Sequence, residues 1–425
     1  MVTVAPDASL DPASTPGRPV RVLLLLTSLH GGGAERVAVH ILNRLDPRRF
    51  EVRMGLLRAS GPYLAQADAT RVVIAPGDGE RFNFDGPNAG NYRPGRLLAG
   101  AIAAPRAFRR MIEDYRPDVV LSFLKGTNLI AWLALMELGL RRPAWIAREG
   151  NNVLAVIEQE APGRIAARVV RALTARAYRR ADVALSNASD LTADLVRCLG
   201  VLPARARTIN NPLDLTEIAR QASEPVPGLP RRPFILTAGR LEYQKAQGLL
   251  IAAYSRSGAA RTHDLVILGQ GSLRDELEAQ VAGAGLSGQV HFPGFAANPY
   301  AWMAACDVFA LPSRWEGFPT AAGEAMACGA PVILADCRYG PRDLMRDGET
   351  GVLVPVDDEA ALAAALARLC ADPAERRRLG ENGRRFVARF DIAPILAEYG
   401  ALFTELARRR VSGEVEPAVL AAKVE

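Results

Sequence analysis

Short runs of consecutive aliphatic residues alternate along the chain with longer segments in which apolar residues recur every three or four positions. A short apolar run is typical of a strand buried on both faces of a parallel sheet, and the wider spacing is typical of an amphipathic helix. In the first half we expect strands at 22–26, 52–57, 72–75, 119–123, 144–147, 183–186 and 207–209. Helices are expected between most of them, at 97–115, 126–138, 165–180 and 191–199.

The alternation is interrupted at 222–233, where four prolines occur in twelve positions. Such a segment is not expected to form regular structure and is the best candidate for a linker. The alternation then resumes, with strands expected at 234–237, 265–268, 290–292, 308–311, 331–334 and 352–354. Residues 358–370 and 373–410 have a helical pattern, and the segment 386–410 is long enough to leave the second domain and pack on the first.

This order of elements predicts an α/β protein with two tandem Rossmann-like domains that face a central cleft. The length of 425 residues agrees with two domains. The boundaries we expect are a disordered leader at 1–19, a first domain at 20–215 joined by a C-terminal helix at about 392–410, a second domain at 216–391, and a tail at 411–425. No run of 18 apolar residues predicts a transmembrane helix, and the leader lacks the apolar core of a signal peptide.

Composition adds an asymmetry of charge to this organisation. Residues 1–215 carry 29 basic and 20 acidic side chains, whereas residues 216–425 carry 23 and 26. A basic first half favours an anionic partner, such as a phosphorylated acceptor or an anionic membrane surface, although a solvated arginine-rich surface gives the same pattern. Nucleic acid is disfavoured because aromatic residues are only 6% and do not alternate with the basic ones. The five cysteines form no CxxC pair, which indicates reduced thiols in the cytoplasm without zinc or disulfides.

Three groups of residues are candidates for chemistry. Three glycines at 31–33 lie between the first strand and a helix, where a backbone can approach an anionic ligand, or simply turn. Arg240 and Lys245 follow the second domain's first strand and together match the charge of a diphosphate. The lysine is one of three in a chain with 49 arginines, which indicates a need for a compact charge.

The third group lies in the segment EGFPTAAGEAMACGAPVI at 316–333. Glu316 and Glu324 are separated by seven residues, and a helix beginning near Thr320 places the first in a loop and the second one turn inside the helix. Both carboxylates are then able to face one ligand, and the amides of Gly317 and Phe318 are able to donate to it. A loop glutamate followed by a surface glutamate would have the same spacing.

Eight segments in a fixed order now carry a resemblance. They are GGGAERV (31–37), SNASDLTADL (186–195), INNPLD (209–214), TAGRLEYQK (237–245), LVILGQGSLRDELE (265–278), VHFPGF (290–295), EGFPTAAGEAMACGAPVI (316–333) and DGETGVLVP (347–355). In these segments the chain resembles family 4 retaining glycosyltransferases with the GT-B fold.

The resemblance implies a role for each matching residue. It implies that Arg240 and Lys245 bind the donor diphosphate, and that Glu316 binds the transferred sugar together with the backbone of Gly317 and Phe318. Glu324 is implied to bind the ribose, and Gly269, Gly271 and the 293–295 turn with Phe295 are implied to line the base pocket. The residues implied on the acceptor side are Gly32, Gly33 and Asn151. Asn151 stands near where relatives often have a histidine. The chain also departs from the pattern at Ala246, where many relatives have glycine, and at 321–323, where many have aliphatic residues.

The implied reaction is a front-side, retaining transfer of a hexosyl or N-acetylhexosaminyl group from a nucleotide-diphosphate sugar, with UDP favoured, to a glycan or lipid-linked acceptor. Such a reaction belongs to cell-envelope polysaccharide or glycolipid synthesis in the cytoplasm. No metal or other cofactor is expected, because the chain has no DxD triplet. A sugar-nucleotide epimerase and a non-catalytic nucleotide-sugar binding module remain alternatives, whereas an NAD-dependent oxidoreductase is disfavoured by the absence of GxGxxG.

The segment 164–180 decides whether peripheral attachment to the inner face of the membrane is expected. It carries six arginines, and its apolar residues include Ile165, Val169, Leu173 and Tyr178. A basic amphipathic helix of this kind is able to rest on an anionic leaflet. We expect instead that its apolar stripe packs on the domain's own sheet, which is the more common use of such a stripe.

Overall fold

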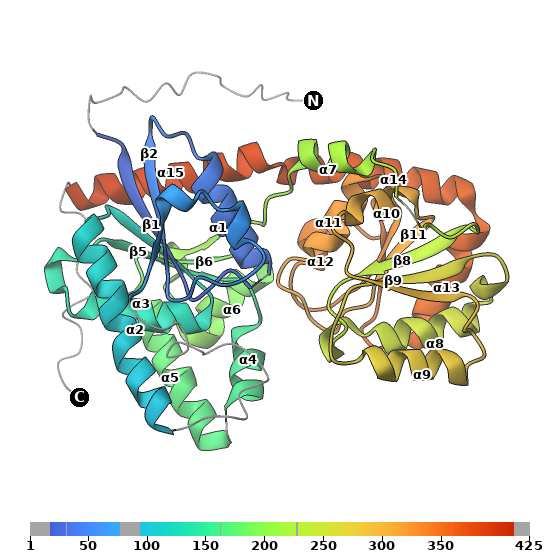
Figure 1. Cartoon of the computed structure of the whole chain (residues 1–425), viewed down its shortest axis with the longest axis horizontal. Coiled ribbons are helices and arrows are strands. Elements are labelled where there is room, and N and C mark those ends of the chain that lie inside the picture. The colour runs from blue at the N-terminus through green and yellow to red at the C-terminus, as the bar shows by residue number, and fades with distance from the viewer. Residues whose placement is uncertain (1–17, 31, 77–93, 162, 227, 412–425) are drawn as a thin grey trace.

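The computed structural model describes residues 18–30, 32–76, 94–161, 163–226 and 228–411. It consists of two lobes that lie side by side, each built on a parallel sheet with helices on both faces (Figure 1). This confirms the expected fold of two Rossmann-like domains. The expected leader and tail lie outside the described residues, except for a few residues at their inner ends, and so does Gly31.

The first lobe contains a seven-stranded sheet in the order β3-β2-β1-β4-β5-β6-β7. The strands are β1 (Val20–Leu26), β2 (Phe50–Leu56), β3 (Val72–Ile74), β4 (Val119–Phe123), β5 (Ala144–Glu149), β6 (Val183–Ser186) and β7 (Ala206–Thr208). All neighbouring pairs are parallel. The central strands are buried on both faces, which is why they appear in the sequence as unbroken apolar runs.

Helices cover both faces of this sheet. They are α1 (Gly33–Arg44), α2 (Pro94–Tyr115), α3 (Lys125–Met136), α4 (Val153–Glu160), α5 (Arg164–Arg180) and α6 (Ser189–Leu199), with short 3-10 turns η1 (Leu64–Gln66), η2 (Ala69–Arg71), η5 (Gly139–Arg141) and η6 (Pro203–Arg205). The core on one face includes α1, and the core on the other includes α2 to α6.

The second lobe contains a six-stranded parallel sheet in the order β10-β9-β8-β11-β12-β13. The strands are β8 (Phe234–Ala238), β9 (Asp264–Leu268), β10 (Val290–Gly294), β11 (Val308–Leu311), β12 (Val332–Ala335) and β13 (Val352–Val354). The helices and 3-10 turns are α7 (Leu215–Ala222), η7 (Tyr243–Lys245), α8 (Gln247–Ser257), η8 (Ala259–Arg261), α9 (Arg274–Gly283), α10 (Pro299–Ala305), α11 (Thr320–Ala327), α12 (Pro341–Leu344), α13 (Glu359–Ala371), α14 (Pro373–Val387) and η9 (Ala388–Phe390).

The chain crosses between the lobes at two adjacent places. The first crossing is at 209–214, before α7, and the second is near Asp391. The backbone N–H of Leu213 donates to the carbonyl of Phe390 at 2.8 Å, which ties the crossings together. The proline-rich segment at 222–233 is therefore not the link between the lobes, because α7 in front of it already packs on α10 of the second lobe.

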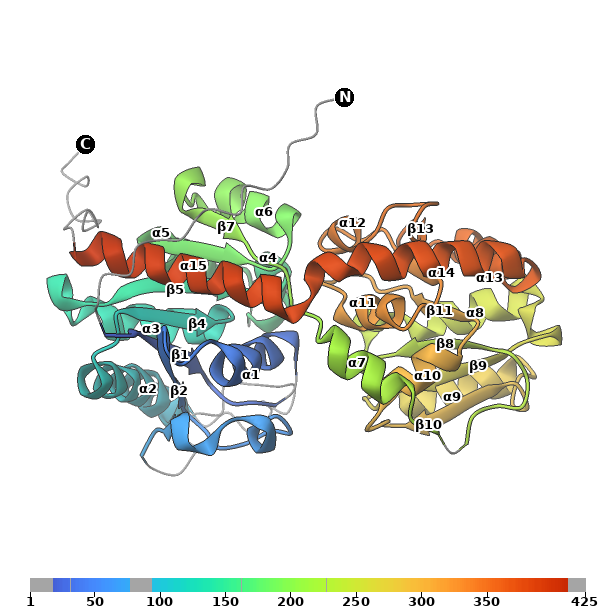
Figure 2. The ribbon, with the colours of Figure 1, turned by 90° about the horizontal axis from the view of Figure 1, so that it is seen from above.

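The last helix, α15 (Ile392–Val411), returns to the first lobe and lies along its sheet (Figure 2). Its apolar side chains, among them Leu396, Tyr399 and Phe403, are buried in the same core as α1. The expected return of the C-terminal segment is confirmed. The segment 386–410 is not one continuous helix, however, because α14 ends at Val387 and a 3-10 turn precedes α15.

The apolar stripe of α5 contradicts the sequence-based expectation at three of its four residues. Ile165, Val169 and Leu173 are 81%, 54% and 44% exposed, so they do not pack on the sheet. The helix is held in place by Tyr178, the fourth residue of the stripe, together with Thr174 and Ala177, all of which are buried. Val170 also packs against this core, whereas Ile165, Val169 and Leu173 are left facing outward.

Candidate functional site

The loops that follow β5 and β11 meet where the lobes touch, and we call this boundary the seam. A Cβ atom added to Gly317 would lie only 1.8 Å from the carbonyl oxygen of Gly150, so the two backbones are in direct contact. Beside them, the amide of Asn211 donates to Thr320 Oγ1 at 3.2 Å. Gly33, at the start of α1, reaches the same place, since its added Cβ would lie 3.0 Å from Asn211 Nδ2. The seam is thus formed by strand ends and by the start of α1.

Lys245 and Glu316 form an ion pair in the second lobe next to this seam. The distance from Lys245 Nζ to Glu316 Oε1 is 2.6 Å, and the side chains are 17% and 9% exposed. The loops that carry Lys245 and Glu316 are also joined through Gln244. Its side-chain amide donates to the backbone carbonyl of Trp315 at 2.8 Å, and its backbone carbonyl accepts from the N–H of Arg314 at 2.8 Å. The predicted phosphate cation and the predicted sugar carboxylate are therefore neighbours.

Arg240 lies beside this pair but does not join it. Its side chain is exposed, and its Nη2 atom lies 3.5 Å from the side-chain oxygen of Gln244. Its backbone is fixed, because the side-chain amide of Gln247 donates to the Arg240 carbonyl at 2.8 Å. Among the described residues Arg240 has no carboxylate partner, so its guanidinium is able to turn toward an anion.

Glu324 lies in α11, a turn inside the helix, as the sequence predicts. It is buried and forms an ion pair with Arg36 of α1, across the seam, and its Oε1 atom also accepts from the Tyr300 hydroxyl at 3.1 Å. The guanidinium of Arg36 is further held by the Tyr63 hydroxyl, at 3.2 Å from Nε and 3.1 Å from Nη2. The neighbouring carboxylate raises the pKa of Arg36, which therefore stays charged.

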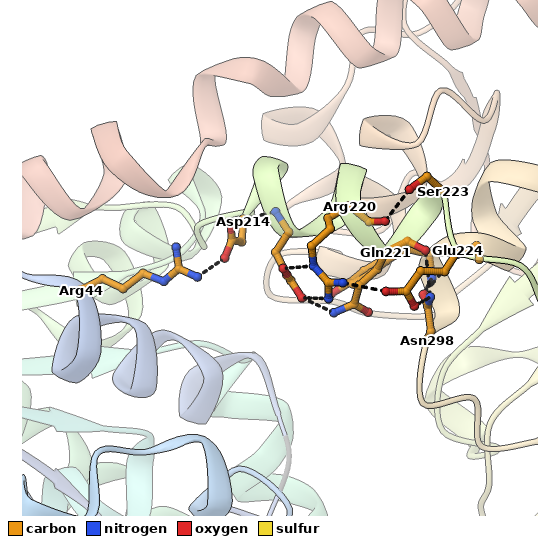
Figure 3. Close-up of polar contacts among 10 residues, drawn as sticks. Arg44, Asp214, Arg220, Gln221, Ser223, Glu224 and Asn298 are labelled. Carbon is orange, nitrogen blue, oxygen red and sulfur yellow. Dashed lines mark hydrogen bonds and ion pairs between the residues drawn. The ribbon is translucent and has the colours of Figure 1, made fainter.

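Arg36 is a site residue that sequence reasoning missed. It lies in the segment GGGAERV, which carried part of the resemblance, but only the glycines received a role. Because α1 turns once in about four residues, His40 and Arg44 follow on the same face. Figure 3 shows Arg44 pointing across to Asp214, which also caps the start of α7. Burial, and then the charges of Arg36 and Arg44, lower the pKa of His40 to about 4.

A second set of contacts joins the lobes through α6. The backbone N–H of Ser189 donates to Asp343 Oδ2 at 2.7 Å. Asp194 accepts from Arg338 Nη2 at 2.7 Å and from the Tyr339 hydroxyl at 2.5 Å. The lobes are thus held together by polar contacts at both α1 and α6, with the seam residues between them.

The loop after β5 is shaped by a buried carboxylate. Glu149 accepts from the backbone N–H groups of Gly150 at 2.9 Å and Asn151 at 3.2 Å, and from the Tyr178 hydroxyl at 2.6 Å. Burial raises the pKa of Glu149. These bonds fix the backbone that meets Gly317, and Asn151 lies one residue from that contact.

Arg148 is a further residue that the sequence left without a role. Its guanidinium is fully buried and donates to the Tyr399 hydroxyl at 2.9 Å and to Asn211 Oδ1 at 2.6 Å. It therefore joins β5, the returning helix α15 and the seam. Its role in the described structure is to support Asn211.

Comparison with known proteins identifies the family of the chain. Residues 31–217 match the model of Glycosyltransferase Family 4, and residues 220–386 match that of Glycosyl transferases group 1. An N-acetylgalactosamine-N,N'-diacetylbacillosaminyl-diphospho-undecaprenol 4-alpha-N-acetylgalactosaminyltransferase of Campylobacter jejuni is 35% identical over 377 residues, which are 87% of this chain and 95% of the relative. The chain belongs to glycosyltransferase family 4.

Two further similarities extend over almost the whole glycosyltransferase. A second Campylobacter jejuni protein, named a GalNAc-alpha-(1->4)-GalNAc-alpha-(1->3)-diNAcBac-PP-undecaprenol alpha-1,4-N-acetyl-D-galactosaminyltransferase, is 26% identical over 91% of this chain and 99% of its own length. The solved structure of Anabaena Alr3699/HepE in complex with UDP and glucose covers 91% of this chain and 99% of its own, with a TM-score of 0.71 and 20% identity. This structural likeness supports the GT-B fold.

The loops after β8 and β9 of the glycosyltransferase touch through their backbones. A Cβ atom added to Gly269 would lie 1.8 Å from the carbonyl oxygen of Gly239, and one added to Gly271 would lie 2.3 Å from that of Leu241. Only glycine permits this approach. Phe295, after β10, is 74% exposed at the same end of the sheet.

Two residues of the predicted donor region have unexpected surroundings. The ring of Phe318 is buried and packs edge-to-face on Phe390 at a centroid distance of 5.3 Å, so only its backbone remains for a ligand. Ala246 has a φ of 53° and a ψ of 38°, the left-handed conformation that favours glycine. A glycine at this position would adopt the same conformation without the strain that a side chain brings.

In the described part of the glycosyltransferase, no cluster of three or more His, Cys, Asp or Glu side chains has the arrangement of a metal site. None of the helices described is both long enough and apolar enough to span a bilayer. The five cysteines are all described and none forms a disulfide.

Proposed function

We propose that this glycosyltransferase moves an N-acetylhexosamine, or a related hexose, from a UDP-sugar to a lipid-linked glycan with retention of the anomeric configuration. The observation that carries the proposal is the Lys245–Glu316 ion pair next to the contact between Gly150 and Gly317. The acceptor class is supported by the two Campylobacter relatives, whose names describe transfer to glycans on undecaprenyl diphosphate. Support for the donor class comes from the relative solved with UDP and glucose.

In the reaction that we propose, the bond from the anomeric carbon to the diphosphate oxygen breaks as the bond to the acceptor oxygen forms. The acceptor's hydroxyl proton passes to the departing diphosphate on the same face of the sugar. Lys245 and Arg240 stabilise the charge that grows on the leaving group, Lys245 as a fixed ammonium and Arg240 as a guanidinium that turns in from solvent. Glu316 holds the sugar hydroxyls and, through the ion pair, fixes the position of the Lys245 ammonium.

We assign the rest of the donor to the neighbouring groups. The ribose diol binds Glu324, because one carboxylate accepts two hydroxyl hydrogen bonds. Gly269 and Gly271 allow the base to lie close to the backbone, and the exposed ring of Phe295 offers a stacking surface. Gly32, Gly33 and Asn151 of the first lobe face the acceptor side.

Charge compensation by Lys245 and Arg240 removes the need for a divalent ion in this proposal. Metal dependence is therefore a direct test, and we expect a chelator to leave the transfer rate unchanged. A rate that collapses with chelator and recovers only with added Mg²⁺ or Mn²⁺ would contradict the assignment of these two cations.

The proposal is tested by screening UDP- and GDP-sugars for thermal stabilisation of the purified protein, and then by assaying the stabilising sugars with a polyprenyl-diphosphate-linked glycan. We expect a glycan extended by one sugar, with the anomeric configuration of the donor retained by NMR. A rearranged sugar nucleotide formed without acceptor would indicate an epimerase instead. Stabilisation by a sugar nucleotide without any turnover would indicate a binding module.

A further inference from the structure

Helix α5 presents three different faces. Thr174, Ala177 and Tyr178 are buried against the first lobe. Ile165, Val169 and Leu173 recur every four residues, so they lie in one line along the helix, and all three are exposed. A third line is basic and contains Arg164, Arg168, Arg171 and Arg179, all of which are exposed.

The exposed apolar line is more than a scatter of surface residues. Helix α5 packs on α3, which packs on α2, and the outer sides of these helices expose Leu133 and Met136 of α3 and Ile102 of α2. The three helices lie in one layer of the first lobe (Figure 1). Large apolar side chains that gather on neighbouring elements of a soluble fold mark an interaction surface.

The charge of α5 indicates what covers this surface. The helix contains six arginines and no acidic residue. In the described structure Arg164, Arg168, Arg171 and Arg176 form no ion pair, so their charge is not neutralised within the lobe. A second copy of the chain would bring two such faces together with strong repulsion between them. A partner surface that is both anionic and apolar would complement both the basic line and the apolar line of the helix.

We propose that α5 docks on an anionic lipid bilayer, with Ile165, Val169 and Leu173 inserted among the headgroups and the flanking arginines on the lipid phosphates. The proposal deepens the proposed function, because it rests on a lipid-linked acceptor as the reason for docking. Helix α4 joins α5 directly to the loop at Gly150. A bilayer under α5 is therefore one short helix away from the seam, where the acceptor is used.

Flotation of the full chain with phosphatidylcholine vesicles, with and without phosphatidylglycerol, tests the docking without any sugar substrate. We expect binding to the anionic vesicles only, and loss of that binding at about 1 M salt, where the Debye length is about 3 Å. Each arginine near an anionic surface contributes about a fivefold change in partition coefficient, so the R164Q/R168Q/R171Q variant should bind about a hundredfold more weakly.

Two matched variants separate this surface from general charge and apolarity. The control R377Q/R384Q/R385Q removes the same charge from exposed positions on α14 of the second lobe and should float like the unchanged protein. The variant I165S/V169S/L173S should lose at least tenfold in binding at unchanged charge, whereas Leu202→Ser, at a 60% exposed apolar residue after α6, should not. Unchanged thermal unfolding of each variant shows that the fold is intact.

Equal binding of the α5 and α14 charge variants would overturn the proposal. So would a stable dimer that dissociates in the I165S/V169S/L173S variant without any flotation, since the face would then contact a second copy. Failure of the docking proposal and failure of the proposed function are distinguishable. Protein that floats as expected but transfers no sugar would support the docking surface and contradict the proposed function. Protein that transfers sugar without floating would support the proposed function and contradict the docking surface.

Discussion

Replacing Lys245 with methionine tests the proposed chemistry most directly, because the substitution keeps the apolar stem and removes only the charge. The ammonium lies 2.6 Å from Glu316 Oε1, and both side chains are largely buried. Two consequences are expected. The leaving diphosphate loses a fixed cation, and Glu316 is left as a buried carboxylate without its partner.

The two consequences have different magnitudes. Removing one preorganised group that stabilises developing charge costs about 3–4 kcal/mol of transition-state stabilisation, which is a loss of about 10²–10³ in kcat. Removing one partner of a fully buried ion pair costs about 3–5 kcal/mol of folding stability. Since Lys245 is 17% exposed, water is able to solvate the carboxylate of Glu316 in the variant. We therefore expect the K245M substitution to lower folding stability by about 2 kcal/mol.

Initial rates of sugar transfer and urea unfolding separate the two effects. The double variant K245M/E316Q removes the unpaired carboxylate and should recover most of the lost stability without recovering turnover. The control Arg256→Met breaks an exposed ion pair with Glu359 and should change neither quantity by a measurable amount. A folded K245M protein with kcat within about threefold of the unchanged enzyme would refute the role assigned to Lys245.

Two other predictions concern helix α1. Arg36→Leu should raise the KM for the sugar nucleotide by about tenfold or more, because Glu324 loses the partner that orients it. The control Arg44→Leu, which breaks the ion pair with Asp214, should leave this KM unchanged. Equal donor KM values for the two variants would contradict the role of Arg36. His40 has a pKa near 4, below its ordinary 6.5, so the unfolded chain binds its proton first and stability falls as the pH drops from about 6.5 to about 4. This loss in the free energy of unfolding amounts to about 3 kcal/mol at most. In urea unfolding, the His40→Gln variant should not show this loss between pH 6.5 and 4. A variant that loses stability as the unchanged protein does would show that His40 is not the source of the loss.

The fold was accessible from the sequence because its strands are buried on both faces. A run such as 119–123 is apolar at nearly every position, and the structure has a strand there with every residue buried. The helix start at Thr320 was also predictable, and with it the place of Glu324 one turn inside α11. These features depend on local pattern alone.

Features that depend on how the lobes meet were not predictable. Arg36 and Glu324 are 288 positions apart, and nothing in either segment indicates that the two helices face each other. The exposed stripe of α5 was missed for a related reason. Periodicity shows that a helix has apolar residues in a line, but it does not show which of its residues pack on the sheet.

Helix α15 has a consequence for how the molecule is made. The core of the lobe that is synthesised first includes Leu396, Tyr399 and Phe403, which are synthesised only after the second lobe. The core of the first lobe is therefore incomplete until the second lobe has been synthesised. A fragment that ends between the lobes would lack the α15 side chains of the first lobe's core. We therefore expect that the first lobe does not fold as a separate module.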